Sequence, residues 1–96
     1  MGNPFAAQTE LLILRLLRDN PAGMYGLQLV ASSDGMLKRG TVYVTLGRLE
    51  EKGFVKSTTE AGPLHSGLPR PLYRITALGE RMLAAADVLG MATQGA

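Results

Sequence analysis

Cysteine is absent from the 96-residue sequence, and histidine occurs once, at His65. The absence of cysteine excludes disulfides, thiolate metal sites and cysteine nucleophiles, and a single histidine excludes a histidine-rich metal site. Glu50 and Glu51 are adjacent, so their carboxylates diverge on a helix and are not an acid–base pair. We therefore expect no enzymatic activity, no catalytic residues, no metal and no cofactor.

Long apolar runs are also missing, since the leucine-rich run at residues 11–14 covers only four residues. A membrane-spanning helix needs about 18 or more. The amino terminus lacks the basic segment of a secretory signal peptide. Hydrophobic residues make up 46% and charged residues 19% of the chain, which is typical of a globular protein. We expect one small domain in the cytoplasm, with no membrane as a partner.

The net charge is only +2, but the basic residues concentrate in the middle of the chain. Residues 38–74 hold seven basic and three acidic side chains, whereas residues 1–37 and 75–96 each carry a net charge of −1. A local excess of positive charge suits a surface that faces a polyanion such as nucleic acid. The alternative is that these cations are solvated and simply keep the protein soluble.

Hydrophobic periodicity and Gly, Pro and Asn breakers predict three helices, a β-hairpin and a fourth helix. The predicted helices are 8–19, 25–32, 40–52 and 77–89, and the strands are 54–59 and 72–75, joined by a loop at 60–69. Three helices followed by a hairpin form a winged helix-turn-helix, in which the third helix enters the major groove of DNA.

We therefore expect a mainly α fold with a small two-stranded β wing. Residues 1–76 would form the winged-helix DNA-binding domain, and residues 77–90 a C-terminal dimerisation helix in the same compact unit. Residues 91–96 are expected to be a frayed tail.

The third predicted helix has two faces. Aliphatic residues at spacings of four and three mark the core side: Val42, Leu46 and Leu49. We expect Thr41, Thr45 and Arg48 on the opposite side, where threonine can contact phosphate or a thymine methyl and arginine can hold guanine. The alternative is that Thr41 only caps the helix and that Arg48 pairs with Glu50 or Glu51.

Further DNA contacts are expected from residues that precede this helix, from Tyr43 within it and from the predicted hairpin that follows it. Lys38 and Arg39 precede it, where the helix amino terminus already favours an anion. Tyr43 lies between the two faces and would either stack on a sugar and donate to a phosphate or pack under the wing. Arg70 and Arg74 are separated by an even number of residues, so in a regular strand they share a face and can contact phosphate.

The first and last helices have more apolar residues than one core-facing side can use. The core is expected to take Leu12, Ile13, Leu16 and Leu17 from the first helix and Leu27, Val30 and Ala31 from the second. Six residues are then left without partners: Leu11, Leu14, Met82, Leu83, Val88 and Leu89. An exposed apolar patch of this kind predicts a two-fold homodimer, whose interface could also hold a small-molecule effector.

Segments within residues 11–83 resemble the PadR family of transcriptional regulators. They are residues 11–17, Gly26-Leu27, the Gly-Thr-Val-Tyr sequence at 40–43, Leu46, the segment 48–53 and the segment 73–79. The chain departs from the family pattern in two ways: Val44 stands where proline is usual, and the wing exit at 67–71 is less basic than usual.

The resemblance implies a DNA-binding regulator that acts as a repressor, in the family branch that has a single C-terminal helix. A homodimer would bind an inverted-repeat operator in double-stranded DNA. The alternative is a winged-helix module that binds a protein and not DNA. Such a module would not need basic residues on the exposed side of the third helix.

Overall fold

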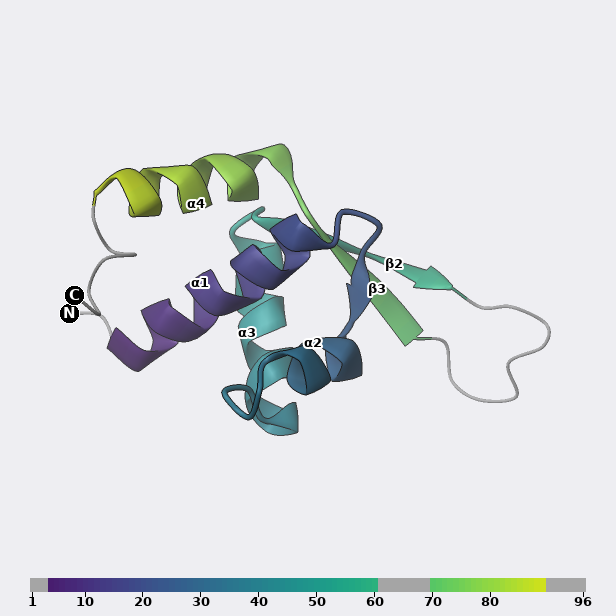
Figure 1. Cartoon of the computed structure of the whole chain (residues 1–96). Coiled ribbons are helices and arrows are strands. Elements are labelled where there is room, and N and C mark those ends of the chain that lie inside the picture. The colour runs from purple at the N-terminus through teal and green to yellow at the C-terminus, as the bar shows by residue number, and fades with distance from the viewer. Residues whose placement is uncertain (1–3, 61–69, 90–96) are drawn as a thin grey trace.

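A computed structural model describes residues 4–60 and 70–89 of the chain. The elements are α1 (Pro4–Asp19), β1 (Met24–Tyr25), α2 (Gly26–Ser32), α3 (Arg39–Glu51), β2 (Val55–Glu60), β3 (Arg70–Ile75) and α4 (Ala77–Val88). Figure 1 shows α1 across the middle of the molecule, α4 above it and the β2–β3 hairpin projecting to one side. This mainly helical fold with a small antiparallel sheet confirms the predicted fold class.

Most element boundaries lie within one residue of the predicted ones, and three differences are larger. The helix α1 begins four residues earlier, at Pro4, because proline is tolerated in the first turn of a helix. The strand β3 begins two residues earlier, at Arg70. The two-residue strand β1 was not predicted, since a pair of residues carries no periodic signal. The predicted tail at 91–96, and residues 61–69 of the predicted loop, lie outside the described residues.

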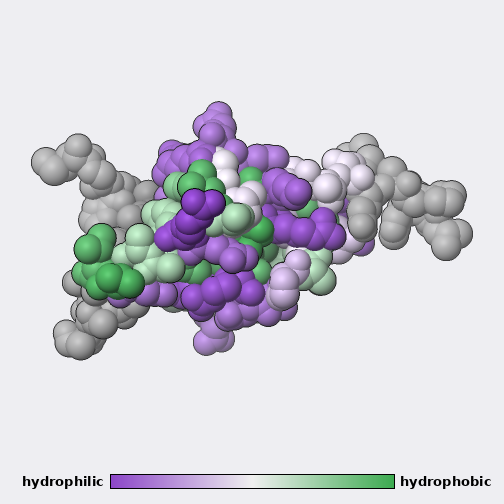
Figure 2. Space-filling view, turned by 90° about the horizontal axis from the view of Figure 1, so that it is seen from above, coloured by the Kyte–Doolittle hydropathy of each residue, from purple (hydrophilic) through white to green (hydrophobic). Residues whose placement is uncertain are grey.

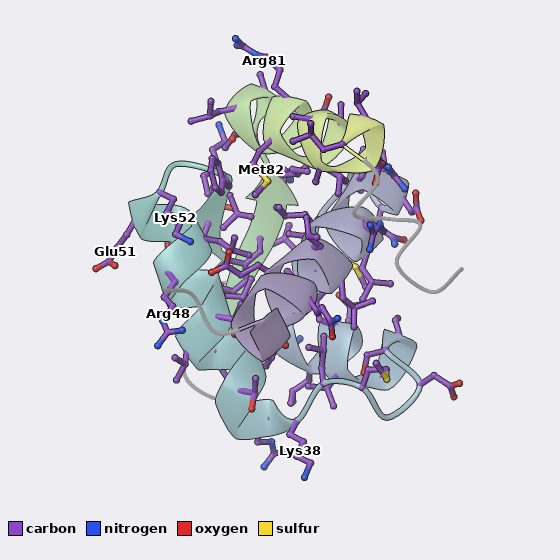
Figure 3. All side chains as sticks on the ribbon, turned by 90° about the vertical axis from the view of Figure 1, so that its left-hand side faces the viewer. Lys38, Arg48, Glu51, Lys52, Arg81 and Met82 are labelled. Atoms are coloured by element: carbon purple, nitrogen blue, oxygen red, sulfur yellow. The ribbon has the colours of Figure 1, made fainter. Side chains whose placement is uncertain are left out.

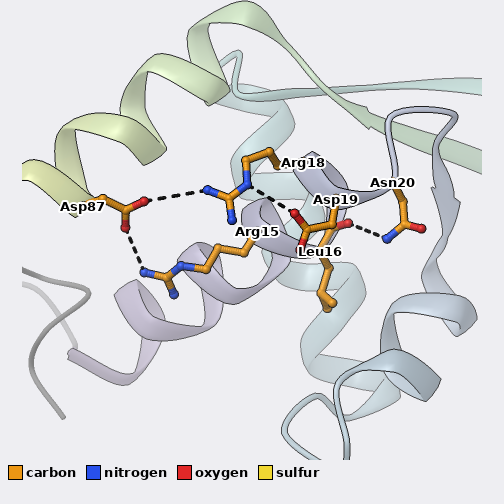
Figure 4. A network of polar contacts seen from close by, with 6 residues as sticks. All are labelled: Arg15, Leu16, Arg18, Asp19, Asn20 and Asp87. Atoms are coloured by element: carbon orange, nitrogen blue, oxygen red, sulfur yellow. Dashed lines mark hydrogen bonds and ion pairs between the residues drawn. The ribbon is translucent and has the colours of Figure 1, made fainter.

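The helix α1 is buried on two sides, not one. Leu14 has no exposed surface, and Leu11 is 4% exposed. On the same side of α1, Arg15 and Arg18 contact Asp87 of α4, with N–O distances of 3.3 and 3.8 Å (Figure 4). The prediction that Leu11 and Leu14 lack partners is therefore wrong, because α4 of the same chain lies along this side.

The inner face of α4 is also buried within the chain. Leu83 is 1% exposed and Ala86 is 4% exposed, and both belong to the hydrophobic core. Leu83 is therefore not free for a dimer interface, contrary to the prediction. Leu12 and Leu16, which were expected in the core, are only partly buried against it.

The short helix α2 turns a different side to the core than predicted. Leu29 is fully buried, whereas Leu27 is 45% exposed and Ala31 is exposed. Val30 is partly buried. Because α2 has only seven residues, its sequence spans too few turns for periodicity to fix the buried side.

The sheet has the strand order β1–β3–β2, and both pairs are antiparallel. Tyr73 of β3 pairs with Met24 of β1 on one side and with Ser57 of β2 on the other. Pro71 is compatible with this central strand because β1 pairs only with residues 72 and 73, so no ladder partner on that side requires its missing N–H. The sheet thus anchors the hairpin next to α2 and α3.

A tight junction connects α3, β2 and the start of α4. Gly53 follows the end of α3 with φ of +83°, a left-handed conformation that glycine adopts readily. The Thr76 hydroxyl accepts a hydrogen bond from the Gly79 N–H at 3.0 Å and donates one to the Gly53 carbonyl at 2.6 Å. A Cβ atom at Gly79 would collide with the Phe54 carbonyl oxygen and lie 2.9 Å from Ile75 Cγ1. The close approach of α4 to the sheet therefore requires glycine at position 79.

We predict that Gly79→Ala lowers the free energy of unfolding by about 1–3 kcal/mol, because the backbone carbonyl of Phe54 cannot move aside cheaply. Gly47→Ala is the matched control, since a Cβ there meets nothing within 4 Å. That change should raise stability by up to about 1 kcal/mol through helix propensity. Urea unfolding followed by circular dichroism measures both; equal effects of the two changes would contradict the packing argument.

Candidate nucleic-acid interface

The helix α3 buries one face and exposes the other along its 13 residues, a length of about 20 Å. Val42, Leu46 and Leu49 have no exposed surface, as predicted. Thr45 is only 6% exposed, so its predicted place on the outer face is wrong. It follows Val42 by three residues and precedes Leu49 by four, and these spacings put it beside the buried stripe.

Most of the candidate contact residues of α3 lie on its exposed side. Lys38 occupies the position before the first turn, Arg39 begins the helix, and Thr41 and Arg48 follow on the surface. Figure 3 shows Lys38 at the amino-terminal end of α3 and Arg48 farther along it, while Arg81 lies at the opposite end of the molecule. The first turn of α3 contains no acidic residue. The amino-terminal part of this side of α3 is therefore basic and accessible, whereas Glu51 adds an exposed negative charge near the carboxyl-terminal end.

The turn that leads into α3 is fixed by a buried serine. The Ser33 hydroxyl donates to the Val30 carbonyl at 2.8 Å and accepts from the Leu37 N–H at 2.9 Å. Gly35, with φ of +85°, permits the sharp reversal, and Leu37 is 2% exposed. Because Leu37 is buried, the chain emerges at Lys38 with its next residues at the surface.

The alternative roles suggested by the sequence for Thr41 and Arg48 are not observed. The residue at the cap of α3 is Lys38, and Thr41 lies inside the first turn. Arg48 forms no ion pair with Glu50 or Glu51 in the described structure. Instead the Glu50 carboxylate accepts a hydrogen bond from the Ser57 hydroxyl of β2 at 2.8 Å. The guanidinium of Arg48 therefore keeps its charge available to a ligand.

Lys52 behaves differently from the other basic residues near α3. Its Nζ donates to both carboxylate oxygens of Glu10, at 3.1 and 3.0 Å. Glu10 is 8% exposed, and burying its charge is favourable only with such a partner. The ion pair fastens the carboxyl-terminal end of α3 to α1 and withdraws Lys52 from the exposed basic set.

Tyr43 has a structural role that sequence reasoning missed. A Cβ atom at Gly26 would lie 2.6 Å from Cε1 and Cζ of the Tyr43 ring, so the ring packs directly on the start of α2. This contact, rather than one under the wing, sets the spacing of α2 and α3. Tyr43 is still 42% exposed, which leaves part of the side chain at the surface.

The buried Tyr73 of β3 lies close to this contact. Burial raises the pKa of the Tyr73 hydroxyl, and the nearby Glu50 carboxylate and Tyr43 add to the rise. The hydroxyl therefore stays neutral at physiological pH. Tyr73 thus joins β3 to the core, while Tyr43 packs α3 against the start of α2.

The hairpin carries basic residues on one face. Arg70, Leu72 and Arg74 are two residues apart along β3, so they share one face of the sheet. Arg74 is opposite Lys56 of β2 on that face. The Arg70 guanidinium lies over the Tyr25 ring at 4.7 Å, and Arg74 Nη1 donates to the Thr58 hydroxyl at 3.4 Å. Both partners are uncharged, so neither arginine is neutralised by these contacts.

Lys56 is a candidate that sequence reasoning did not single out. It is exposed, and its pairing with Arg74 brings a second cation to the same face of the hairpin. The alternation of residues along the predicted strand 54–59 was a signal for its orientation. What the sequence did not provide was the register of the two strands, which decides that Lys56 and Arg74 are neighbours.

The sequence pattern of one protein family matches most of the chain. Residues 13–85 match the family described as the Transcriptional regulator PadR-like family. The chain belongs to this family. No curated protein sequence matches the chain. The resemblance inferred from the residue motifs is therefore confirmed.

Solved structures of PadR-like proteins have the same fold. A PadR-like transcription factor from Bacteroides fragilis is 20% identical, with a TM-score of 0.79 over 94% of this chain and 86% of that one. A PadR family regulator from Eggerthella lenta is 27% identical, with a TM-score of 0.74 over 93% of this chain and 77% of that one. Bacillus subtilis PadR, whose structure is a complex with operator DNA, is 22% identical, with a TM-score of 0.71 over 80% of this chain and 46% of that one.

The dimer residues predicted for this PadR-like chain divide into two groups. Leu11, Leu14 and Leu83 are buried in the core, as described above, and Met82 is half-buried. Val88 and Leu89, at the end of α4, are 84% and 79% exposed. Figure 2, which views the molecule from the α4 side, shows strongly hydrophobic surface at the end of the molecule where α4 terminates.

A shallow hollow lies on another part of the PadR-like chain, between α1 and the turn before α3. Its lining residues are Gln8, Thr9, Leu12, Arg15 and Met36.

Among residues 4–60 and 70–89, no helix is long and apolar enough to cross a membrane. In the same ranges, no three His, Asp or Glu side chains gather as they would around a metal ion.

Proposed function

We propose that this PadR-like transcriptional regulator binds double-stranded DNA as a homodimer and represses transcription from an inverted-repeat operator. The observation that carries the proposal is the exposed side of α3, where Lys38, Arg39 and Arg48 form no ion pair with any described residue. The operator complex of the B. subtilis relative supports DNA as the ligand of this fold. Such a regulator acts in the cytoplasm, by binding rather than by catalysis.

In this proposal α3 enters the major groove with its amino-terminal end nearest the phosphates. The free N–H groups of the first turn favour an anion, and Lys38 and Arg39 add two positive charges beside them. The Thr41 hydroxyl can donate to a phosphate from the same turn. Arg48 lies two turns further along and can donate two hydrogen bonds to O6 and N7 of guanine.

The hairpin supplies phosphate contacts next to those of α3. Arg70, Arg74 and Lys56 have long side chains on one face of the sheet, where they can follow the DNA backbone. Contacts of this kind position the protein but do not distinguish one base from another. We therefore assign specificity to α3 and sequence-independent affinity to the hairpin.

The homodimer is proposed to form at the exposed end of α4, where Val88 and Leu89 are exposed and Met82 is half-buried. A two-fold axis there would set two copies of α3 in major grooves about 34 Å apart or a multiple of that distance. The effector expected at the dimer interface stays a prediction. The hollow lined in part by Leu12, Arg15 and Met36 is a second place where a small molecule could bind.

The competing hypothesis is a winged-helix module that binds a protein and not DNA. The unpaired cations of α3 favour DNA, because a protein-binding surface has no general need for several free basic side chains along one helix. A salt-dependent mobility shift with the DNA upstream of its own gene distinguishes the two hypotheses.

We predict that Arg48→Ala weakens specific DNA binding by about 1–3 kcal/mol and reduces discrimination between operator variants, because the two hydrogen bonds to guanine can no longer form. Arg81→Ala is the matched control, since Arg81 is an exposed cation of α4 at the opposite end of the molecule. Fluorescence anisotropy with operator and scrambled duplexes measures the effect. Equal behaviour of the two variants, with the fold intact, would remove Arg48 from the interface.

The proposed phosphate contacts of the hairpin lead to a prediction about sequence-independent affinity. Replacing Arg70 and Arg74 together by alanine should lower affinity for all DNA sequences alike. It should also reduce the slope of log affinity against log salt by about one unit for each arginine that binds a phosphate. Titrations between 50 and 200 mM salt, roughly the range in which counterion release dominates, measure the slope. An unchanged slope would mean that the hairpin does not contact phosphate.

The dimer is tested at the end of α4. Leu89→Glu should reduce dimer formation and affinity for the full operator together, while leaving the thermal unfolding transition in place because Leu89 is exposed. Leu78→Glu is the control: it makes the same change at a half-exposed position in the first turn of α4. Sedimentation velocity and anisotropy measure the two properties. A Leu89→Glu protein that still dimerises would place the interface elsewhere.

A further inference from the structure

Val44 has an unusual position on the recognition helix. It is 58% exposed, although it is a branched apolar residue in a helix whose other exposed side chains are mostly polar or charged. It lies on the side of α3 away from the fully buried Val42 and Leu46. No packing within the described chain accounts for its placement there.

Two glycines flank Val44 on this outer face. Gly40 precedes it by four residues and Gly47 follows it by three, so all three positions form one stripe along the helix. A Cβ atom at either glycine would meet nothing within 4 Å. Neither glycine has a positive φ.

The fold therefore gives no reason for glycine at position 47. Glycine inside a helix is less favourable than alanine, because its backbone loses more freedom on folding. Gly79 and Gly26, in contrast, are required by close contacts with Phe54 and Tyr43. Gly40 and Gly47 act on the outside of α3: they leave bare backbone at the surface along one side of Val44, while Thr41 and Arg48 lie along its other side.

We propose that Val44 is a specificity-determining residue that reads the 5-methyl group of a thymine in the major groove. Apolar side chains contact this methyl group directly, and it is the feature that marks thymine on the floor of the groove. Valine is short, so the contact requires the helix backbone to approach closely, and glycine at 40 and 47 permits that approach. The inference rests on the proposed DNA binding by α3.

The position of the thymine follows from the helix geometry. Arg48 lies four residues after Val44, about 6 Å along the helix axis, and the two side chains are neighbours on the surface. Successive bases are about 3.4 Å apart along each strand. The thymine read by Val44 should therefore lie within about two base pairs of the guanine read by Arg48, once in each half of the operator.

The test begins with duplexes selected for binding to the unaltered protein from a random pool. Each thymine in a half-site is then replaced in turn by deoxyuridine, which keeps the hydrogen-bonding edge and lacks only the methyl group. We expect one thymine per half-site at which this change weakens binding about three- to ten-fold. In Val44→Ala the same change should have less than about a two-fold effect. Leu78→Ala, a truncation at a half-exposed leucine of α4, should retain the full thymine preference.

Gly47→Ala provides an independent measurement. The variant should unfold at the same or a higher temperature than the unaltered protein and should bind the selected duplex at least about ten-fold more weakly. Loss of affinity without loss of stability is the signature expected of a close approach. Unchanged affinity would overturn the role proposed for the glycine.

The outcomes separate this inference from the function on which it rests. If the protein selects no duplex from the pool, the proposed DNA binding itself fails. If binding depends on Arg48 but the deoxyuridine penalty persists in Val44→Ala, or no thymine shows a penalty, the DNA interface stands and the role of Val44 is wrong.

Discussion

The buried carboxylate of Glu10 constrains the recognition helix. Its 8% exposure makes a counter-ion necessary, and Lys52, at the end of α3, supplies it with two short contacts. The carboxyl-terminal end of α3 is thereby held against α1, while its amino-terminal end is held by Leu37 and the Ser33 turn. Between these two fixed ends, the outer side of α3 projects from a rigid frame, as readout of base edges requires.

The fold class, the order of the main elements and the buried stripe of α3 could be predicted because each has a strong local signal. The errors come from packing that periodicity does not encode. The partners of Leu11 and Leu14 cannot be found from periodicity, because it does not show that α4 covers a second side of α1. The contact of Tyr43 with Gly26 was missed for a similar reason: a glycine in sequence does not reveal which side chain will lie against it.

The charges that remain free are distributed by the same packing. Asp87 is held by Arg15 and Arg18, and Glu10 by Lys52, so these acidic groups are paired with cations away from the outer side of α3. Arg70 and Arg74 contact uncharged partners instead, a ring and a hydroxyl. Asp87 and Glu10 thus neutralise cations that hold the helices together, whereas Lys38, Arg39 and Arg48 form no ion pair with a described residue. A small net charge of +2 is therefore compatible with a local excess of positive charge at the start of α3 and on the hairpin.

The burial of Leu11, Leu14 and Leu83 within one chain also changes the energetics of dimerisation. Six apolar residues per protomer would contribute much more to a dimer interface than two, but the described chain leaves only Val88 and Leu89 of that set largely exposed, at 84% and 79%. Burying two such side chains from each protomer contributes about 1.5–3 kcal/mol per residue. Association costs about 4–15 kcal/mol in lost translational and rotational freedom, an amount of similar size. In the proposed complex, two half-sites on one DNA duplex would hold the protomers together and lower this cost, so dimerisation and operator binding should be thermodynamically coupled.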